Sequence, residues 1–160
     1  MKNVEVKAVL ILENIRSAQN VGAIFRTADA IGISKIYLVG YTPAPLDKFK
    51  RPSKEIAKTA LGAEKTIEWE SVTSTPSLIA YLKKENFIVV AVEQTPNAVD
   101  YKKFIAAPRT AFVLGNEVDG VLHETLDNVD MTIEIPMHGK KESLNVATTA
   151  GVILFRALDK

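Results

Sequence analysis

A dense group of polar residues lies near the start of the chain, within residues 13–20. Asn20 has two interpretations, because an asparagine here either caps the following helix or belongs to a polar site. Arg26 follows among apolar neighbours such as Phe25, so we expect little exposed surface there and a guanidinium that needs an anion or an acidic partner. The polar members of the segment are Asn14, Arg16, Ser17, Gln19 and Asn20.

A second polar segment, residues 114–120, follows an apolar run and contains two glycines. No Lys-Ser or Lys-Thr follows these glycines, and no predicted strand leads into Gly-x-Gly-x-x-Gly. The sequence therefore argues against a Walker A loop and against an ordinary Rossmann dinucleotide site. Glu117 lies either in a plain strand-to-helix turn or in a turn that presents a carboxylate at the mouth of a sheet.

A third polar segment covers residues 135–145. His138 lies within it, and the only other histidine is His123, while the sequence contains no cysteine. A zinc site would therefore need carboxylates to complete it, and we expect no metal. Ser143 has no Gly-x-Ser-x-Gly pattern around it, which argues against a serine hydrolase.

Short apolar runs alternate with helical segments along the chain, a pattern that predicts a parallel α/β sheet. Ligands of such sheets collect at the carboxyl ends of the strands, where all three polar segments are expected. We expect strands at 6–12, 35–39, 66–69, 87–92, 110–114 and 131–135. We expect helices at 21–31 capped by Asn20, between Ser53 and Gly62, up to residue 85 with Thr75 as cap and Pro76 first, and at 144–158 capped by Ser143.

The chain has 160 residues, of which 47 % are hydrophobic and 24 % are charged, as in an ordinary globular protein. This composition excludes a disordered chain, a coiled coil and a collagen-like fibre, and the length predicts a single domain over residues 1–160. No apolar run approaches the ~18 residues that a membrane span needs. Since the absence of cysteine also fits a reducing compartment, we expect a cytoplasmic protein.

Basic residues concentrate between Asp47 and Lys58, where five basic and two acidic residues give a local balance of +3, in a chain whose net charge is +1. A run this short is either a solvated helix face or a basic patch that contacts a partner.

Taken together, the three polar segments resemble the three motifs of the SpoU (TrmH-type) RNA 2′-O-ribose methyltransferases. Residues 14–28 resemble motif 1, residues 113–121 motif 2 and residues 135–147 motif 3, in the order of that family. Any one motif would be a weak signal, whereas three in order over nearly the whole chain are a specific one. The resemblance implies a SPOUT fold, which is an α/β parallel sheet flanked by helices with a C-terminal trefoil knot.

The same resemblance implies S-adenosylmethionine as the cofactor, bound by the loops of the knot. A leucine at Gly115 is expected to fill the space beside the cofactor without unfolding the chain. By motif position, we expect the cofactor to be bound by Leu114, Gly115, Ile135, Met137, Ser143 and Leu144, together with Thr95.

The resemblance also implies a homodimer in which two subunits complete each active site. The first and last helices carry apolar residues, such as Phe25 and Leu154, in excess of what one sheet face needs, and we expect the dimer to bury this excess.

In the family the motif 1 arginine, here Arg26, is proposed to accept the proton of the ribose hydroxyl. Because a guanidinium has a pKa above ~12, Arg26 has an alternative role: holding the adjacent phosphate while phosphate or water takes the proton. Asn20, Glu117, Ser143 and Asn145 are expected to orient Arg26, the ribose and the cofactor. The RNA, either tRNA or rRNA, is expected to contact Asn14, Arg16, Lys48, Lys50 and Arg51.

Two other functions remain open. One is a non-catalytic RNA-binding or assembly protein on the same fold, against which the joint presence of Asn20, Arg26, Glu117, Ser143 and Asn145 argues. The other is a SPOUT enzyme that methylates a base nitrogen, although the motif 1 arginine and Ser-Leu-Asn of motif 3 favour ribose. With no separate RNA-binding domain expected, target selection is assigned to this domain and its dimer.

Overall fold

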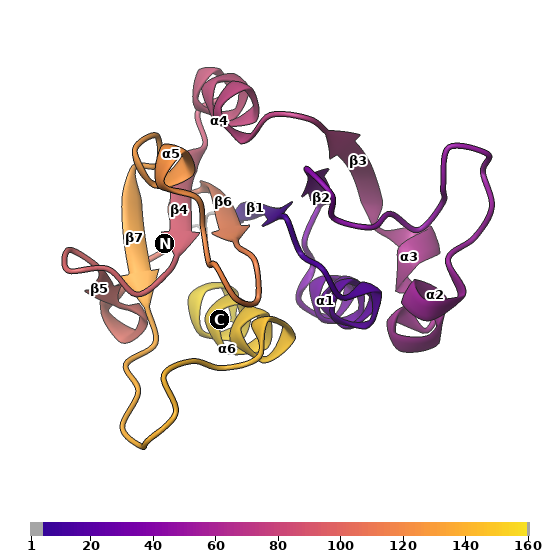
Figure 1. Cartoon of the computed structure of the whole chain (residues 1–160). Helices are drawn as coiled ribbons and strands as arrows, with labels where there is room; N and C mark the ends of the chain where they lie inside the picture. Colours follow the sequence, from indigo (N-terminus) through magenta and orange to yellow (C-terminus); the bar gives the residue numbers. More distant parts are fainter. Residues whose placement is uncertain (1–4, 160) are drawn as a thin grey trace.

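Seven parallel strands form one sheet in the computed structural model, which describes residues 5–159 (Figure 1). Residues 1–4 and 160 belong to the predicted domain 1–160 and lie outside the described residues. The strand order is β3-β2-β1-β6-β4-β7-β5. The strands are β1 (Lys7–Glu13), β2 (Lys35–Val39), β3 (Glu68–Val72), β4 (Ile88–Val92), β5 (Val99–Asp100), β6 (Arg109–Leu114) and β7 (Met131–Glu134).

Helices cover both faces of this sheet, so the predicted α/β class is confirmed. In Figure 1, α1, α2 and α6 lie on one side of the strands and α4 and α5 on the other. Among residues 5–159, no helix is both long and apolar enough to cross a membrane. The helices are α1 (Ala18–Ile31), α2 (Lys54–Ala60), α3 (Ala63–Thr66), α4 (Thr75–Lys84), α5 (His123–Leu126) and α6 (Val146–Leu158), with a 3₁₀ turn, η1, at Tyr101–Lys103.

The side chains of β1 show how the sheet serves two hydrophobic cores. Leu10 and Leu12 pack in the core that includes α1 and α6, while Val9 and Ile11 pack in the core that includes α4. Successive side chains of a strand point to opposite faces, so a strand covered on both sides must be apolar at every position. The near-continuous apolar runs of β4 and β6 have the same cause, and their prediction as central strands is confirmed.

Three predicted helix caps are wrong, and in two of them, Asn20 and Thr75, the predicted side chain bonds elsewhere. Ser17, not Asn20, caps α1, and its Oγ accepts a hydrogen bond from Asn20 N at 3.1 Å. Ser74, not Thr75, caps α4, since the Thr75 hydroxyl donates to a buried carboxylate of β1. Asn145, not Ser143, caps α6, which therefore begins at residue 146.

Several short elements differ from the predicted pattern. The strand expected at 66–69 is β3, which begins only at Glu68 because the residues before it form the single turn of α3. The pattern does not predict β5 or α5 either. Each has too few residues for a hydrophobic period to be visible.

Candidate functional site

A cavity of about 650 Å³ opens where the carboxyl ends of β4, β6 and β7 meet. Its walls come from residues 92–96, 114–121, 134–135 and 143–146, with Met137, Thr149, and His123 and Leu126 of α5. Segments far apart in the sequence meet here because parallel strands end at the same edge of a sheet. The structure brings all seven expected cofactor residues to this wall, namely Thr95, Leu114, Gly115, Ile135, Met137, Ser143 and Leu144.

Glu117 connects the second polar segment to the start of α1. Its carboxylate accepts hydrogen bonds from Arg16 N at 2.9 Å, from Ser17 N at 3.1 Å and from Asn20 Nδ2 at 3.2 Å. Burial alone would raise the pKa of Glu117, but the backbone N–H groups of Arg16 and Ser17 and the Asn20 amide lower it below its ordinary value. Glu117 is therefore ionised at neutral pH and holds the first turn of α1 in place.

Asn20 extends this connection to the third polar segment. Its Oδ1 accepts a hydrogen bond from Asn145 Nδ2 at 3.1 Å, while its own Nδ2 donates to Glu117. Asn145 Oδ1 in turn accepts from Ala147 N at 2.8 Å and caps α6. Glu117, Asn20 and Asn145 thus form one chain of hydrogen bonds that fixes three loops relative to one another.

The loop after β6 is shaped by close backbone approach. A Cβ at Gly115 would lie 2.4 Å from the backbone atoms Gly120 C and Val121 N. The expectation that a leucine there fills only cofactor space is therefore wrong, because any side chain would push the loop apart. Gly120 has φ +71°, and a Cβ on it would meet Glu93 Oε2 at 2.1 Å.

Two carboxylates that sequence reasoning missed fix residues 121–125, a segment that borders the cavity. Glu93, which follows β4, accepts a hydrogen bond from Val121 N at 2.9 Å. Glu13 at the end of β1 is only 1 % exposed and accepts from the hydroxyls of Thr75 and Thr125 and from Leu122 N. An acidic residue directly after an apolar run was the available signal in both cases.

The loop between β7 and α6 is tied to the opposite side of the cavity mouth. Gln94 Nε2 donates a hydrogen bond to the backbone oxygen of Glu142 at 2.7 Å. Ser143 and Leu144 follow directly and line the cavity. His138, Lys140 and Lys141 of this loop are exposed.

Arg26 does not lie in this cavity. Its side chain is exposed, which contradicts the expectation of a helix with little free surface, because α1 turns Ile24, Phe25 and Ala28 toward the core instead. Arg26 lines a second, open hollow between α1, α2 and α6, together with Ala23, Thr27, Ala30, Lys58, Thr59, Leu61 and Phe155.

The apolar residues that were expected to exceed the needs of one sheet face do not lie in this hollow. Phe25 and Leu154 are 0 % and 1 % exposed within the chain's own core. That part of the argument for a dimer is therefore wrong. The exposed apolar side chains at the hollow are different ones, Leu61 directly after α2 at 65 % and Phe155 of α6 at 42 %.

The expected RNA-contacting residues fall into two groups. Asn14 holds the loops together, since its Oδ1 accepts from Tyr41 N at 3.3 Å and its backbone oxygen accepts from Asn116 Nδ2 at 2.9 Å. Exposed positions are occupied by Arg16, Lys48, Lys50 and Arg51. Among residues 5–159, no group of three or more His, Asp or Glu side chains could hold a metal ion.

A parallel α/β sheet with a ligand-sized cavity at the carboxyl ends of its strands defines the class of this protein. A model of the SpoU rRNA Methylase family matches residues 7–155, and the chain belongs to this family, a member of the SPOUT superfamily.

Relatives and solved structures match most of the chain. The 23S rRNA (guanosine-2′-O-)-methyltransferase RlmB of Neisseria meningitidis serogroup B is 33 % identical over 150 residues, which cover 94 % of this chain and 57 % of the relative. The tRNA (guanosine(18)-2′-O)-methyltransferase of Escherichia coli K12 is 30 % identical, covering 91 % and 60 %. The AdoMet-bound rRNA methyltransferase from Sinorhizobium meliloti superimposes with a TM-score of 0.85 at 29 % identity, covering 95 % and 56 %. The chain spans about three fifths of the length of these curated relatives.

Proposed function

We propose that this chain transfers a methyl group from S-adenosylmethionine to a ribose 2′-hydroxyl of tRNA or rRNA. The observation that carries the proposal is the chain of hydrogen bonds Glu117–Asn20–Asn145, which joins the three family motifs beside the cavity. The names of the two curated relatives, both guanosine 2′-O-methyltransferases, support this activity.

The cavity fits the proposed cofactor in size and chemistry. Its volume of about 650 Å³ lies within the ~300–1,000 Å³ typical of small-molecule sites. Leu114, Ile135 and Leu144 offer apolar surface, while Thr95 and Ser143 offer hydroxyls. The S. meliloti structure, named as AdoMet-bound, supports the same assignment. When bound, S-adenosylmethionine supplies a methyl group on a positively charged sulfur. The ribose oxygen attacks this methyl carbon in line, and the sulfur is the leaving group.

The side chains around the cavity have different tasks in this proposal. The hydrogen bonds among Asn20, Glu117 and Asn145 hold the three loops in fixed positions, so that ribose and cofactor meet at a fixed angle. Ser143 lies on the cavity wall beside Leu144 and orients the ribose. A dry pocket favours this reaction because positive charge disappears from the sulfur as the bond forms.

Arg26 acts, we propose, on the partner subunit of a homodimer. Its side chain lies in the hollow of α1, α2 and α6 and not in the chain's own cavity, and the exposed Leu61 and Phe155 flank it. Pairing of this surface with a second copy buries apolar area and delivers the guanidinium to the other cavity. There its planar fork holds the phosphate beside the reacting hydroxyl, and phosphate or water accepts the proton.

We further propose that residues 1–160 act as one domain whose C-terminal segment is threaded into a trefoil knot. The position of β7 between β4 and β5 supports this, because the chain leaves the sheet from an interior strand before α6 packs against α1. An RNA substrate is consistent with a cytoplasmic location.

The test is methylation of total RNA with labelled S-adenosylmethionine, followed by digestion and nucleoside analysis. We expect a 2′-O-methylated nucleoside. A base-methylated nucleoside would show a different acceptor atom on the same fold. RNA binding without any product would show a non-catalytic protein.

A further inference from the structure

Phe49 is an exposed aromatic residue on the loop between β2 and α2, outside the cofactor cavity. Its relative exposure is 65 %, and among the described residues it belongs to neither hydrophobic core. Two cations flank its ring, Lys48 with Nζ 5.1 Å and Arg51 with Cζ 5.0 Å from the centroid. A ring that serves no packing purpose and lies between cations is a surface for a flat, anionic partner.

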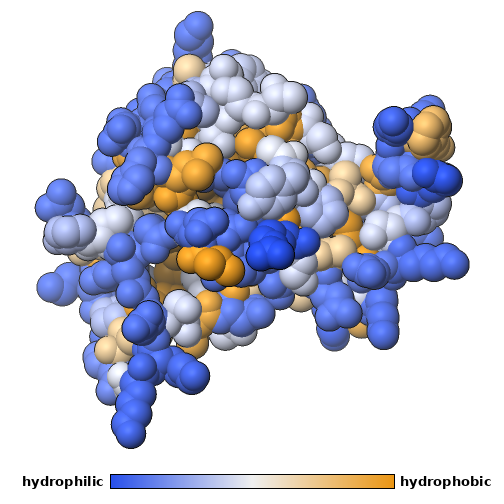
Figure 2. Space-filling model, viewed as in Figure 1, coloured by the Kyte–Doolittle hydropathy of each residue, from blue (hydrophilic) through white to orange (hydrophobic). Residues whose placement is uncertain are grey.

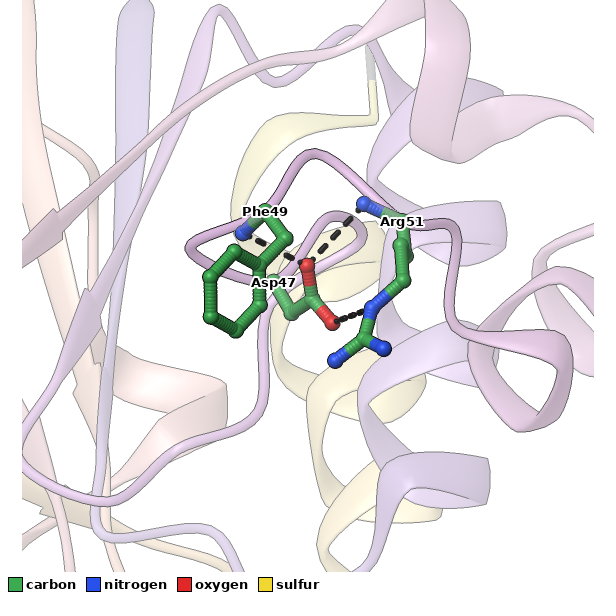
Figure 3. A network of polar contacts seen from close by, with 3 residues as sticks. All are labelled: Asp47, Phe49 and Arg51. Atoms are coloured by element: carbon green, nitrogen blue, oxygen red, sulfur yellow. Dashed lines mark hydrogen bonds and ion pairs between the residues drawn. The ribbon is translucent and has the colours of Figure 1, made fainter.

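Asp47 fixes the turn that carries this ring. Its Oδ1 accepts hydrogen bonds from Phe49 N at 2.8 Å and Arg51 N at 3.0 Å, and its Oδ2 accepts from Arg51 Nε at 2.8 Å (Figure 3). In the same view no dashed line joins either terminal nitrogen of Arg51 to Asp47, and the Arg51 side chain is 71 % exposed. The guanidinium is therefore anchored through Nε and keeps its outer edge open to a further acceptor.

The base of the loop is fixed as well. Leu46 pairs with Pro52 in an antiparallel bridge, and Ser53 N donates to Pro45 O at 2.9 Å. The buried hydroxyl of Thr42 donates to Leu12 O at 2.8 Å and so attaches the loop to the end of β1. A preorganised loop loses little conformational entropy on binding.

The charge and position of the loop match a nucleic acid that reaches the cavity. Between Asp47 and Lys58 the balance is +3. The loop leaves the carboxyl end of β2, and the cavity opens at the carboxyl ends of other strands of the same parallel sheet. The Tyr41 hydroxyl joins the two, because it accepts a hydrogen bond at 2.9 Å from Nδ2 of Asn116, which lines the cavity. Figure 2 shows the loop as a projection at the upper right, with an apolar group between hydrophilic ones.

We propose that Phe49 is a stacking platform for one unpaired base of the RNA, with Lys48 and Arg51 binding the adjoining phosphates. Aromatic rings beside cations hold single strands in this way, because every base has a face on which a ring stacks. The bases of a duplex are already stacked on one another, so the platform selects unpaired nucleotides. The inference rests on RNA being the substrate, as proposed above.

The test measures binding, separately from methyl transfer. A labelled single-stranded oligoribonucleotide of mixed sequence and the duplex of the same sequence are titrated with the protein by fluorescence anisotropy. Phe49→Ala is expected to weaken binding of the single strand about tenfold, while Phe49→Trp preserves it. Duplex binding is expected to change little in either variant.

Two further variants separate stacking from charge. Lys48→Ala is expected to reduce the slope of log affinity against log salt by about one, whereas Phe49→Ala leaves that slope unchanged. Tyr81→Ala on α4 removes a ring of similar exposure, 53 %, and is expected to bind as the wild type does. Thermal unfolding should be unaffected by Phe49→Ala because the ring packs in no core.

The outcomes distinguish this inference from the proposed function. Unchanged single-strand affinity in Phe49→Ala, or an equal loss on the duplex, overturns the platform even if the wild type methylates ribose. A loss confined to the single strand supports the platform even if no methylated nucleoside forms. A wild-type protein that binds neither probe overturns the inference.

Discussion

Glu117 accepts hydrogen bonds from residues about a hundred positions earlier in the chain, and its charge is what makes those bonds strong. The donors are the backbone N–H groups of Arg16 and Ser17, the two residues directly before α1. A carboxylate of a distant loop therefore fixes the residues that lead into α1, while the Ser17 side chain caps the helix locally.

We expect Glu117→Gln to lower the free energy of unfolding by about 1–2 kcal/mol at neutral pH. Because the pKa of Glu117 is lower in the folded state than its ordinary value of 4.5, its stabilising effect is complete above pH 4.5 and disappears as the pH falls further. The difference between the wild type and Glu117→Gln should therefore shrink in acid. Denaturant unfolding across this range measures it, with Asp119→Asn as the exposed control on the same loop. A difference that stays constant into strong acid would contradict the role of the charge.

The role proposed for Arg26 depends on the planar geometry of its guanidinium and not on its charge alone. A lysine keeps the positive charge but loses the planar fork that binds a phosphate through two hydrogen bonds. We expect Arg26→Lys to lose at least about tenfold in turnover with unchanged cofactor affinity, and Arg26→Ala to lose slightly more. Single-turnover methylation beside cofactor calorimetry separates the two effects. Near-normal turnover of Arg26→Lys would show that charge suffices.

At the scale of the elements, the Asn145 side chain both caps α6 and connects this helix to α1. Asn145 caps the helix through Oδ1 and reaches Asn20 through Nδ2. The two functions can be separated, since an aspartate keeps the cap but offers no N–H to Asn20.

We expect Asn145→Ala to cost about 1 kcal/mol of stability through the lost cap. Asn145→Asp should keep this stability yet weaken cofactor binding, because two oxygens then face each other at the junction of the loops. Denaturant unfolding and calorimetry on both variants test the separation. Equal behaviour of the two variants in both measurements would mean that cap and junction are not separable.

The same elements show what sequence reasoning could and could not predict. Apolar runs buried on both faces, such as β4 and β6, are visible in the sequence because every position must be apolar. The cap of α1 was misassigned because Asn20 and Ser17 are both good caps, and the choice depends on Glu117, which lies far away in sequence. The order of the motifs predicted the lining of the cavity. The expectation for Arg26 overlooked the spacing of the apolar residues of α1, which lie on one face of the helix and leave Arg26 on the exposed face.

At the scale of the whole molecule, Arg26 lines the hollow between α1, α2 and α6 and is therefore separate from the cavity of its own chain. A second copy resolves this separation if the pairing places the hollow of one chain beside the cavity of the other. Such a pairing would be stabilised by burying apolar side chains that are exposed in the single chain, such as Leu61 and Phe155.

We expect the protein to be a dimer by light scattering at micromolar concentration. Phe155→Glu places a charge in the hollow and should yield a folded monomer without methyl transfer. Circular dichroism provides the check on folding, and Tyr81→Glu on the opposite face is the control that stays dimeric. A wild-type monomer with full activity would exclude the shared site.

Mixing two inactive variants tests the sharing directly. Arg26→Ala keeps a sound cavity, and Leu144→Asp places a charge in the cavity at a residue that is 40 % exposed and therefore outside the core. A dimer with one chain of each kind pairs an intact Arg26 with an intact cavity. We expect activity to reappear on mixing, and its absence in verified mixed dimers would show that Arg26 serves its own chain.

The hydrogen bond between Asn20 and Asn145 spans 125 positions of the sequence. During translation the first of these residues leaves the ribosome long before the second is made, so the nascent chain can form β1, α1 and β2 but not this junction. We therefore expect the proposed cofactor binding to wait until α6 has emerged. A chain that ends before Asn145 lacks one wall of the cavity and cannot form the complete site proposed for the cofactor.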